Sequence, residues 1–272
     1  MDKKTLNLMF ENLLHIGNKT NYWNPKMKNH IYGSVNGIHV FNLIKTGKEL
    51  AKAKENLTKA ASEWKKILFV ATKLQARDAF SKLATDTGHF YVTEKWVPGL
   101  LTNFKTIRKR ISTYLKLLKD SENGSLDILT KKEKAAKLLE LEKLDKAFKW
   151  LKEMKKVPDI IFAVDGAFEV QALREANSLN LPSLAVLNTN GDPDRVEAFI
   201  PANTNSVKSI DFIAAELNSS LAWVKVVSKS VPRKLTDKKK FVKPVTGTKA
   251  PAKKVEDKKA PAEKAPAKKE EK

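Results

Sequence analysis

Short apolar runs alternate with amphipathic segments along most of this chain. The runs are rich in branched and aromatic side chains and are bounded by turn residues, which is typical of strands buried on both faces. They lie at residues 38–43, 67–71, 90–92, 160–164, 184–187 and 198–200. Between them, apolar residues recur at helical spacing. The alternation predicts an α/β fold with a parallel, doubly wound (flavodoxin-like) sheet flanked by helices.

Local signals predict where the first helices begin and end. Apolar residues at helical spacing in 6–14 predict a first helix that Gly17 ends, because glycine readily adopts a positive φ. The tetrapeptide Thr46-Gly47-Lys48-Glu49 has the pattern of a capping box. The helix that follows it is expected to bury one face, with Trp64 as its last member.

A different pattern occupies residues 99–156. Apolar residues step by four and three along two arms, as in the seam of a coiled coil, and a turn at 120–125 separates the arms. Thr130 and Glu133 form a second capping box at the start of the second arm. We therefore expect an antiparallel coiled-coil helical hairpin, inserted into an α/β globular domain of residues 1–98 and 157–228. The seam residues are Leu100, Phe104, Ile107, Ile111, Tyr114 and Leu118, then Leu141, Leu144, Phe148, Leu151 and Met154.

The chain is strongly basic. Lys and Arg exceed Asp and Glu by 52 − 31 = 21 among 272 residues, and such an excess points to a polyanionic partner. Residues 229–272 hold 16 of these cations against 6 carboxylates, in a Lys/Ala/Pro-rich stretch with few large apolar residues. Such a stretch is expected to be a disordered basic tail. A solubility tail and a weak contact to rRNA both fit its composition.

The composition also bears on location. No apolar run approaches the ~20 residues of a membrane-spanning helix. Asn7, Glu11 and Asn12 interrupt the N-terminal segment, unlike in a secretory signal. The chain has no cysteine, so disulfides and thiolate chemistry are excluded. We expect a cytoplasmic protein without a membrane contact.

Two segments combine basic side chains with groups that suit nucleic acid. In the loop 17–28, flat aromatic rings stand beside lysines, which suits phosphates and unstacked bases. Its candidate RNA-binding residues are Lys19, Tyr22, Trp23, Lys26 and Lys28. The first hairpin arm adds Asn103, Lys105, Arg108, Lys109 and Arg110, a cluster whose guanidinium groups can bind phosphate oxygens in a bidentate manner. These residues alone leave open whether the aromatic pair merely caps the edge of the core.

Signals for catalysis or a cofactor are weak. Thr46-Gly47-Lys48 lacks the upstream glycine of a phosphate loop, and no nucleophile elbow or dinucleotide fingerprint occurs. The four histidines have neither helical metal spacing nor a cysteine partner. Asp165, Asp192 and Asp194 fall at expected strand ends and could hold a divalent ion, but turn formation explains them more simply. We expect no catalytic residue, no cofactor and no metal.

The N-terminal segment also carries a family resemblance. His15-Ile16-Gly17-Asn18-Lys19-Thr20, Tyr22-Trp23-Asn24-Pro25-Lys26-Met27 and Asn36-Gly37-Ile38-His39 resemble the signature of the bacterial small-subunit ribosomal protein S2 family. Further similar blocks follow in order at residues 66–73, 99–104, 129–133, 141–144, 158–162, 174–177 and 188–194. The basic tail is outside the resemblance.

The resemblance implies a structural, non-enzymatic ribosomal protein that acts in translation. In the family, the α/β domain docks on small-subunit rRNA at the head–body junction, and the coiled-coil hairpin also touches rRNA. Neighbouring ribosomal proteins complete surroundings that lie near the messenger exit. These roles carry over only to residues 17–28, 99–110 and the lysine-rich hairpin. The expected partners are small-subunit rRNA and neighbouring ribosomal proteins, and the expected location is ribosome-bound in the cytoplasm.

The sequence departs from the family pattern in places. Asn18 stands where the family has His, and Pro98 where it has Gly. The stretch Gly166-Ala167-Phe168-Glu169 lacks the family's acidic–His pair, so no ion or protein contact is carried over to it. The alternative from another class is a nucleotide- or sugar-phosphate-binding α/β enzyme, which needs glycine-rich loops or convergent catalytic groups at the strand ends.

Overall fold

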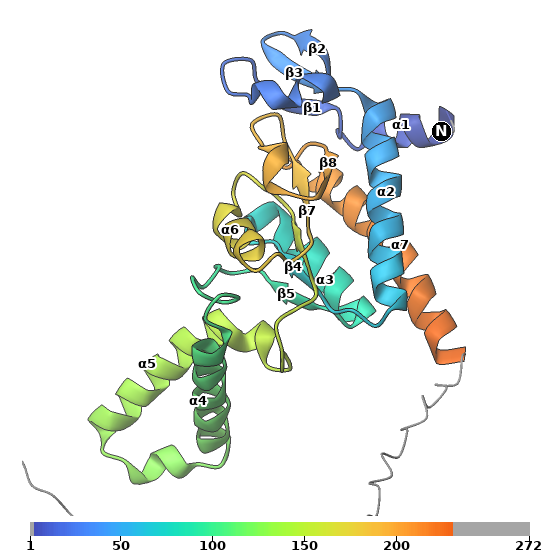
Figure 1. The fold of residues 1–272 in the computed structure, drawn as a ribbon. Helices are drawn as coiled ribbons and strands as arrows, with labels where there is room; N and C mark the ends of the chain where they lie inside the picture. The colour runs from blue at the N-terminus through green and yellow to red at the C-terminus, as the bar shows by residue number, and fades with distance from the viewer. Residues whose placement is uncertain (1–2, 231–272) are drawn as a thin grey trace, which may run out of the picture. The chain divides into compact units, whose positions relative to one another are not determined.

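The computed structural model describes residues 3–230. From residue 231 onward, the predicted basic tail lies outside the described residues. The described part holds a five-stranded and a three-stranded sheet with helices around them (Figure 1). None of its helices is long and apolar enough to span a membrane.

The larger sheet is parallel throughout, as predicted. Its strands are β4 (Ile67–Val70), β5 (Phe90–Val92), β6 (Ile160–Ala163), β7 (Ser183–Leu187) and β8 (Ala198–Pro201). They are arranged in the order β5-β4-β6-β7-β8. This corresponds to 2-1-3-4-5, the order of flavodoxin-like sheets, and its switch point lies between β4 and β6.

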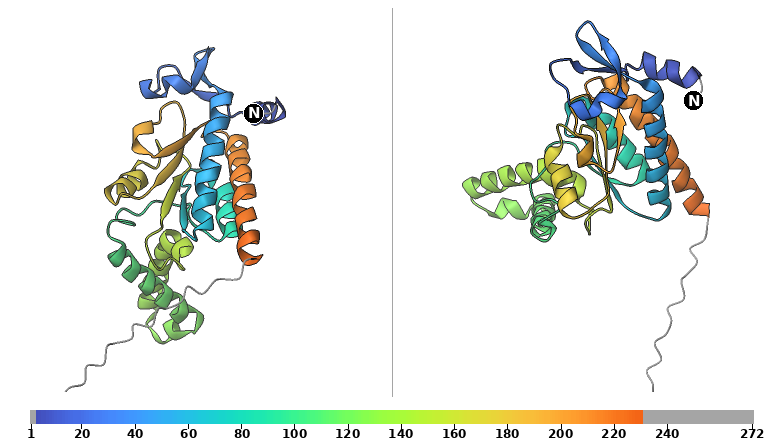
Figure 2. Two further views of the ribbon diagram at one scale, coloured as in Figure 1. Left: turned by 45° about the vertical axis from the view of Figure 1, so that its right-hand side comes forward. Right: turned by 45° about the horizontal axis from the view of Figure 1, so that its top comes forward.

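Helices cover both faces of this sheet. Side chains along each strand alternate between the faces, so each strand presents apolar side chains to both layers of helices. Phe69 and Phe162 point to the face covered by α2 (Leu43–Ser62), α3 (Arg77–Thr87) and α7 (Val207–Ser230). Leu68 and Ile161 point to the other face, which α6 (Val170–Ser178) and the start of α4 (Phe104–Glu122) cover. The two layers are visible on either side of the sheet in Figure 2. Burying each of these large side chains contributes roughly 1.5–3 kcal/mol.

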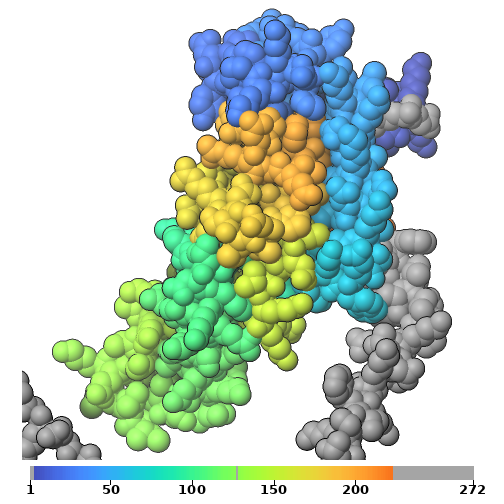
Figure 3. Space-filling model, in the orientation of Figure 1, coloured from blue at the N-terminus to red at the C-terminus, as the bar shows by residue number. Residues whose placement is uncertain are grey.

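The N-terminal segment forms a sheet of its own, and its placement corrects one prediction. After α1 (Lys3–Glu11), strands β1 (Ile16–Lys19), β2 (Ile31–Val35) and β3 (Ile38–Phe41) pair antiparallel in the order β1-β3-β2. The predicted strand at 38–43 exists, but it does not belong to the parallel sheet. Asn36 and Gly37, with φ of 50° and 75°, form a two-residue turn of the kind that Asn-Gly favours. Figure 3 shows this small sheet, in blue, against the orange segment that carries β8.

Two further expectations about α2 were wrong. The helix begins at Leu43 because the Asn42 side chain caps it, accepting from Ile44 N at 3.1 Å. Thr46 is buried inside the helix, and its hydroxyl donates to the Pro201 carbonyl at 2.7 Å. The helix ends at Ser62, and Trp64 lies beyond it at φ 61° with 62 % of its surface exposed. In the sequence, the helical spacing of large apolar residues continues to Trp64, although the backbone leaves the helix after Ser62.

Residues 104–148 form two helices at the predicted places, α4 and α5 (Lys131–Phe148), linked through a 3-10 turn (Ser125–Ile128). The predicted capping box starts α5, where the Glu133 carboxylate accepts from Thr130 N at 3.2 Å. The buried Tyr114 hydroxyl of α4 donates to the Asp145 carboxylate of α5. Helix α5 ends at Phe148, so the predicted seam residues Leu151 and Met154 are buried beyond it, outside that helix.

Candidate nucleic-acid interface

The loop 17–28 is held against the end of β7 by Thr189. Its hydroxyl accepts from Asn18 N at 3.0 Å, and its carbonyl accepts from Asn24 N at 2.8 Å. A Cβ on Gly17 would lie 2.6 Å from Thr189 Cγ2. Gly17 therefore allows a close approach of two chain segments and does not end α1, as the sequence had suggested. Leu13, at φ 61°, takes the left-handed position after that helix.

Lys26 fixes the middle of the loop. Its ammonium lies 3.2 Å from Asp192 Oδ1 and 2.5 Å from Asp194 Oδ2. Hydrogen bonds to Asp194, which has the larger effect, and to Asp192 raise the pKa of Lys26. The neighbouring Met27 is fully buried, in contact with the core cluster that contains Leu187. Lys26 thus binds protein carboxylates in this structure, and its charge is largely matched.

Other candidate side chains of the loop face outward. Lys19 and Lys28 are exposed. Tyr22 is 65 % exposed, so it does not cap the core. Trp23 is 36 % exposed, and its ring lies 5.2 Å from the His39 ring, which supports one side of it. The capping interpretation is wrong for Tyr22 and holds only in part for Trp23.

A buried carboxylate organises the second segment. Glu175 of α6 is 4 % exposed and accepts from the Trp96 indole at 3.0 Å, Gly99 N at 2.8 Å and Leu101 N at 3.0 Å. Burial alone raises the pKa of Glu175, but these hydrogen bonds, with one from Thr102, outweigh it, and the net pKa is lowered. The ionised carboxylate therefore gathers the chain just before α4 and sets where that helix begins.

The candidate cations on α4 differ in their surroundings. Lys105, Arg108, Lys109 and Arg110 are all exposed, and so is Asn103 just before the helix. The Arg108 guanidinium donates to the Lys155 carbonyl, tying the start of α4 to the chain that follows α5. Helical spacing places Lys105, Lys109 and the exposed Lys116 in one row, opposite the buried Ile107 and Ile111. The sequence interpretation missed Lys116, although its spacing of seven from Lys109 was a sufficient signal.

Both segments lie in long stretches of the sequence that contain neither Asp nor Glu. Residues 12–48 contain five lysines, Lys19, Lys26, Lys28, Lys45 and Lys48, and neither Asp nor Glu. Residues 95–119 contain seven cations and again neither acid; the cations are Lys95, Lys105, Arg108, Lys109, Arg110, Lys116 and Lys119. Helix α5 differs, because Lys137 and Lys146 pair with its own Glu140 and Glu142. An unopposed row of cations produces the positive potential that a phosphate backbone needs.

The strand-end carboxylates are already paired with protein groups. Asp165, after β6, accepts from Lys73 Nζ at 2.8 Å, Thr204 Oγ1 at 2.7 Å and Ala167 N at 3.0 Å. Asp192 and Asp194 bind Lys26, and Asp192 starts the short 3-10 helix Pro193–Arg195. Within residues 3–230, no cluster of His, Cys, Asp and Glu has the arrangement of a metal site. The turn interpretation is confirmed for Asp165 and Asp192, whose side chains accept from Ala167 N and Asp194 N, whereas the Asp194 side chain pairs with Lys26. Glu169, which accepts from Thr72 N at 2.8 Å, is a further carboxylate at the strand ends that the sequence did not reveal.

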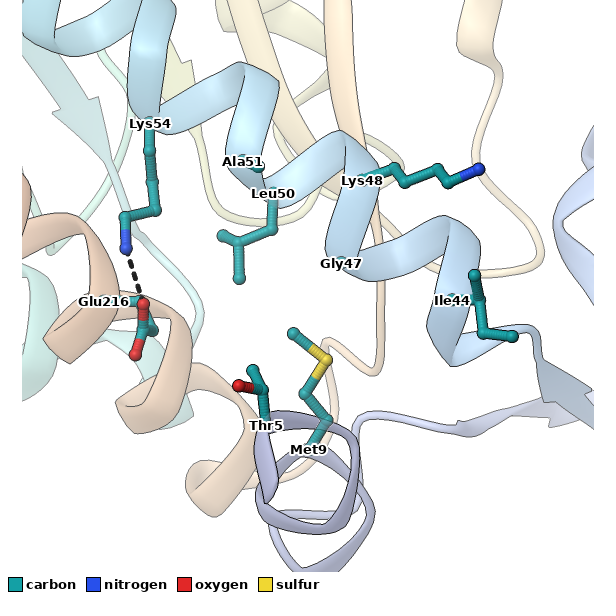
Figure 4. A pocket seen from close by; sticks show the side chains of 9 residues that line it. All are labelled: Thr5, Met9, Ile44, Gly47, Lys48, Leu50, Ala51, Lys54 and Glu216. Atoms are coloured by element: carbon teal, nitrogen blue, oxygen red, sulfur yellow. Dashed lines mark hydrogen bonds and ion pairs between the residues drawn. The ribbon is translucent and has the colours of Figure 1, made fainter. Parts of the chain in front are cut away.

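A groove of about 420 Å³ lies between α1, α2 and α7 (Figure 4). Met9, Leu50 and Ala51 give it an apolar lining. Lys54 and Glu216 stand at one side and pair with each other at 2.6 Å. The groove holds no nucleophile with an adjacent base, so it offers nothing to the enzyme alternative.

Comparisons with known proteins agree with the resemblance. Residues 9–222 match the family described as "Ribosomal protein S2". "Small ribosomal subunit protein uS2c" of Cyanophora paradoxa is 40 % identical over 217 residues, which cover 80 % of this chain and 93 % of the relative. "Small ribosomal subunit protein uS2" of Coprothermobacter proteolyticus is 42 % identical over 217 residues, covering 80 % and 81 %. The protein of the same name from Mannheimia succiniciproducens is 42 % identical over 197 residues, covering 72 % and 81 %.

Proposed function

Because this chain belongs to the ribosomal protein S2 family, we propose that it is a structural component of the small ribosomal subunit and binds its rRNA. The curated relatives carry the name of small ribosomal subunit proteins, and they align over most of their own lengths. A ribosomal protein family is not an enzyme class, and nothing in the comparisons favours the nucleotide- or sugar-phosphate-binding enzyme. The protein works in translation, bound to the ribosome in the cytoplasm.

The observation that carries the RNA-binding part of this proposal is the coincidence of charge and anchoring. The two carboxylate-free segments, 12–48 and 95–119, are also those that Thr189 and Glu175 fix to the α/β body. Cations that are held in place lose less entropy when they bind phosphate. Folded RNA is recognised mainly through its shape and phosphates, which suits cations spread over a rigid body.

The cations then have two roles. Lys19 and Lys28 on the loop, and Lys105, Lys109 and Arg110 on α4, bind rRNA phosphates, with Asn103 as a polar contact beside them. Lys26 and Arg108 act mainly by positioning, because each already binds a protein group. Tyr22 and Trp23 present flat faces to the same RNA.

The helix pair extends this interface. We place a helical hairpin at residues 99–156, with α4 and α5 packed as an antiparallel coiled coil, inserted between the globular parts 1–98 and 157–228. The hydrogen bond from the buried Tyr114 to the half-buried Asp145 supports one fixed register of the two helices. The lysine row of α4 then faces rRNA. Neighbouring ribosomal proteins cover other surfaces, and the messenger exit lies nearby.

A salt titration of RNA binding tests the proposal. The full chain is bound to small-subunit rRNA at increasing salt, and Lys105, Lys109 and Arg110 are replaced together by Ala. The variant should lose about one unit of the log–log salt slope for each phosphate contact removed. The matched control replaces Lys52, Lys59 and Lys65, three cations that pair with Glu49, Glu55 and Glu63. Equal slopes for the site variant and the control would contradict the assignment of α4.

A further inference from the structure

The hairpin of β2 and β3 carries an irregularity that exposes an aromatic side chain. Ile31 lies opposite Phe41 and Gly33 opposite Val40, so Tyr32 has no partner residue across the ladder. Such a bulge redirects the side chain of the extra residue. Tyr32 is 81 % exposed, the highest value of any aromatic side chain in the described residues. The exposed Tyr22 lies in the loop that joins β1 to the same hairpin.

Within residues 3–230, neither ring has a stacking partner. Among the ring–ring and cation–π contacts of the described residues, none involves Tyr22 or Tyr32. The outward face of the small sheet beside them is also open. A Cβ on Gly33 would meet nothing within 4 Å, and Val35 and Ile38 next to the turn are exposed. Lys19 lies directly opposite Ile38 on that sheet.

We propose that this small sheet and its loop form a docking surface for unpaired rRNA nucleotides, with Tyr22 and Tyr32 stacking on bases. The inference rests on the proposed function and makes it more specific. Flat rings among lysines are the means by which proteins bind single strands, whereas a duplex hides its base faces. The complete absence of carboxylates from residues 12–48 favours an anionic nucleic acid over a protein neighbour.

Helix α4 provides a contrast within the same chain. Its outward row consists of lysines, while its aromatic residues Phe104 and Tyr114 pack against the core cluster below. That surface can bind the phosphates of single-stranded or of duplex RNA, but it has no exposed aromatic ring on which a base could stack. The small sheet therefore distinguishes unpaired from paired nucleotides, and α4 does not.

Two RNA probes separate these roles. The full chain is bound to an unstructured oligouridylate and to an A-form duplex of equal charge, at roughly 150 mM salt, where weak long-range attraction is screened. Replacing Tyr22 and Tyr32 by Ala should weaken oligouridylate binding about thirtyfold or more, as expected for the loss of two stacked bases. Duplex binding and both salt slopes should not change. Replacing both tyrosines by Phe should preserve binding, because stacking needs the ring and not the hydroxyl.

The controls keep the outcomes distinct. Phe168→Ala removes a ring outside the small sheet that is 62 % exposed, close to the 65 % of Tyr22, and it should leave binding to both probes unaffected. A photo-crosslinker at position 32 in assembled small subunits should give an adduct that RNase removes. An adduct with a protein, or wild-type oligouridylate binding by the double Ala variant, would overturn the inference. Either result would leave the proposed function standing, because that depends on association with the subunit.

Discussion

The carboxylate of Glu175 and the indole nitrogen of Trp96 lie 3.0 Å apart, although the residues are on separate segments of the chain. Both residues are buried, and the same carboxylate also accepts three backbone N–H groups of residues 99–102. One side chain of α6 therefore fixes the entire approach to α4. Trp96 is part of the core under the helix pair.

Replacing Glu175 by Ala should destabilise the protein by about 3 kcal/mol, because it leaves several buried donors without an acceptor. Glu175→Gln should cost roughly half as much, about 1.5 kcal/mol, since one carbonyl oxygen can still accept. Urea unfolding measures both. If Glu175→Ala unfolds at the wild-type urea midpoint, the carboxylate does not organise this segment.

Glu169 predicts a pH effect of defined sign. Burial raises the pKa of this carboxyl, against the opposing effect of hydrogen bonds from Thr72. The folded protein then keeps a proton that the unfolded chain has lost. The free energy of unfolding therefore falls as pH rises from the usual Glu range near ~4.3 through the raised folded pKa, and it levels off above that.

The variant Glu169→Gln isolates this effect. Its amide oxygen can still accept from Thr72, but the side chain does not titrate. Urea unfolding at a series of pH values should show wild type losing stability relative to the variant as pH rises over that window. A difference between the two proteins that stays constant across the window would show that the pKa of Glu169 is not raised.

Gly17 and Thr189 should behave as a coupled pair. A Cβ at position 17 would lie 2.6 Å from Thr189 Cγ2, so Gly17→Ala should cost about 1–3 kcal/mol through overpacking. Thr189→Ser removes that methyl group and keeps the hydroxyl that Asn18 N binds. The double variant should be more stable than the sum of the single effects predicts. Additive losses in urea unfolding would mean that the two residues do not compete for this space.

The neighbouring lysines of the loop should have different effects on RNA binding. Lys28 is exposed, so Lys28→Ala should reduce the log–log salt slope of rRNA binding by about one unit. Lys26 already binds Asp192 and Asp194, so Lys26→Ala should change the slope little and loosen the loop instead. Faster proteolysis of the loop in the Lys26 variant would report that loosening. Equal slope changes for the two variants would show that Lys26 leaves its carboxylates for phosphate.

The strands of the parallel sheet and the positions of α4 and α5 followed from periodicity, because doubly buried strands and helical seams leave strong local patterns. Trp64 shows the limit of such patterns: its spacing fits a helix face, yet the backbone leaves the helix before it. The Thr46 tetrapeptide failed as a cap because Asn42 caps earlier and Thr46 bonds to Pro201, far away in sequence. Long-range partners of this kind have no local signal.

The candidate interface was predictable to a similar extent. Its aromatic and basic residues are contiguous in sequence, so they could be chosen directly, and Asn36-Gly37 could have revealed the antiparallel hairpin. The roles of Lys26 and Arg108 could not be predicted, since each depends on an acceptor far away in the chain. Tyr32 was missed because a single aromatic residue in a short strand does not indicate a bulge.

The most direct test of the central claim is sedimentation of cell lysate through a sucrose gradient at low and at high salt, with this chain followed by mass spectrometry. A structural component of the small subunit should sediment with that subunit in stoichiometric amount, and it should stay there in salt that strips loosely held factors. A chain that remains at the top of the gradient under both conditions would contradict the proposed function.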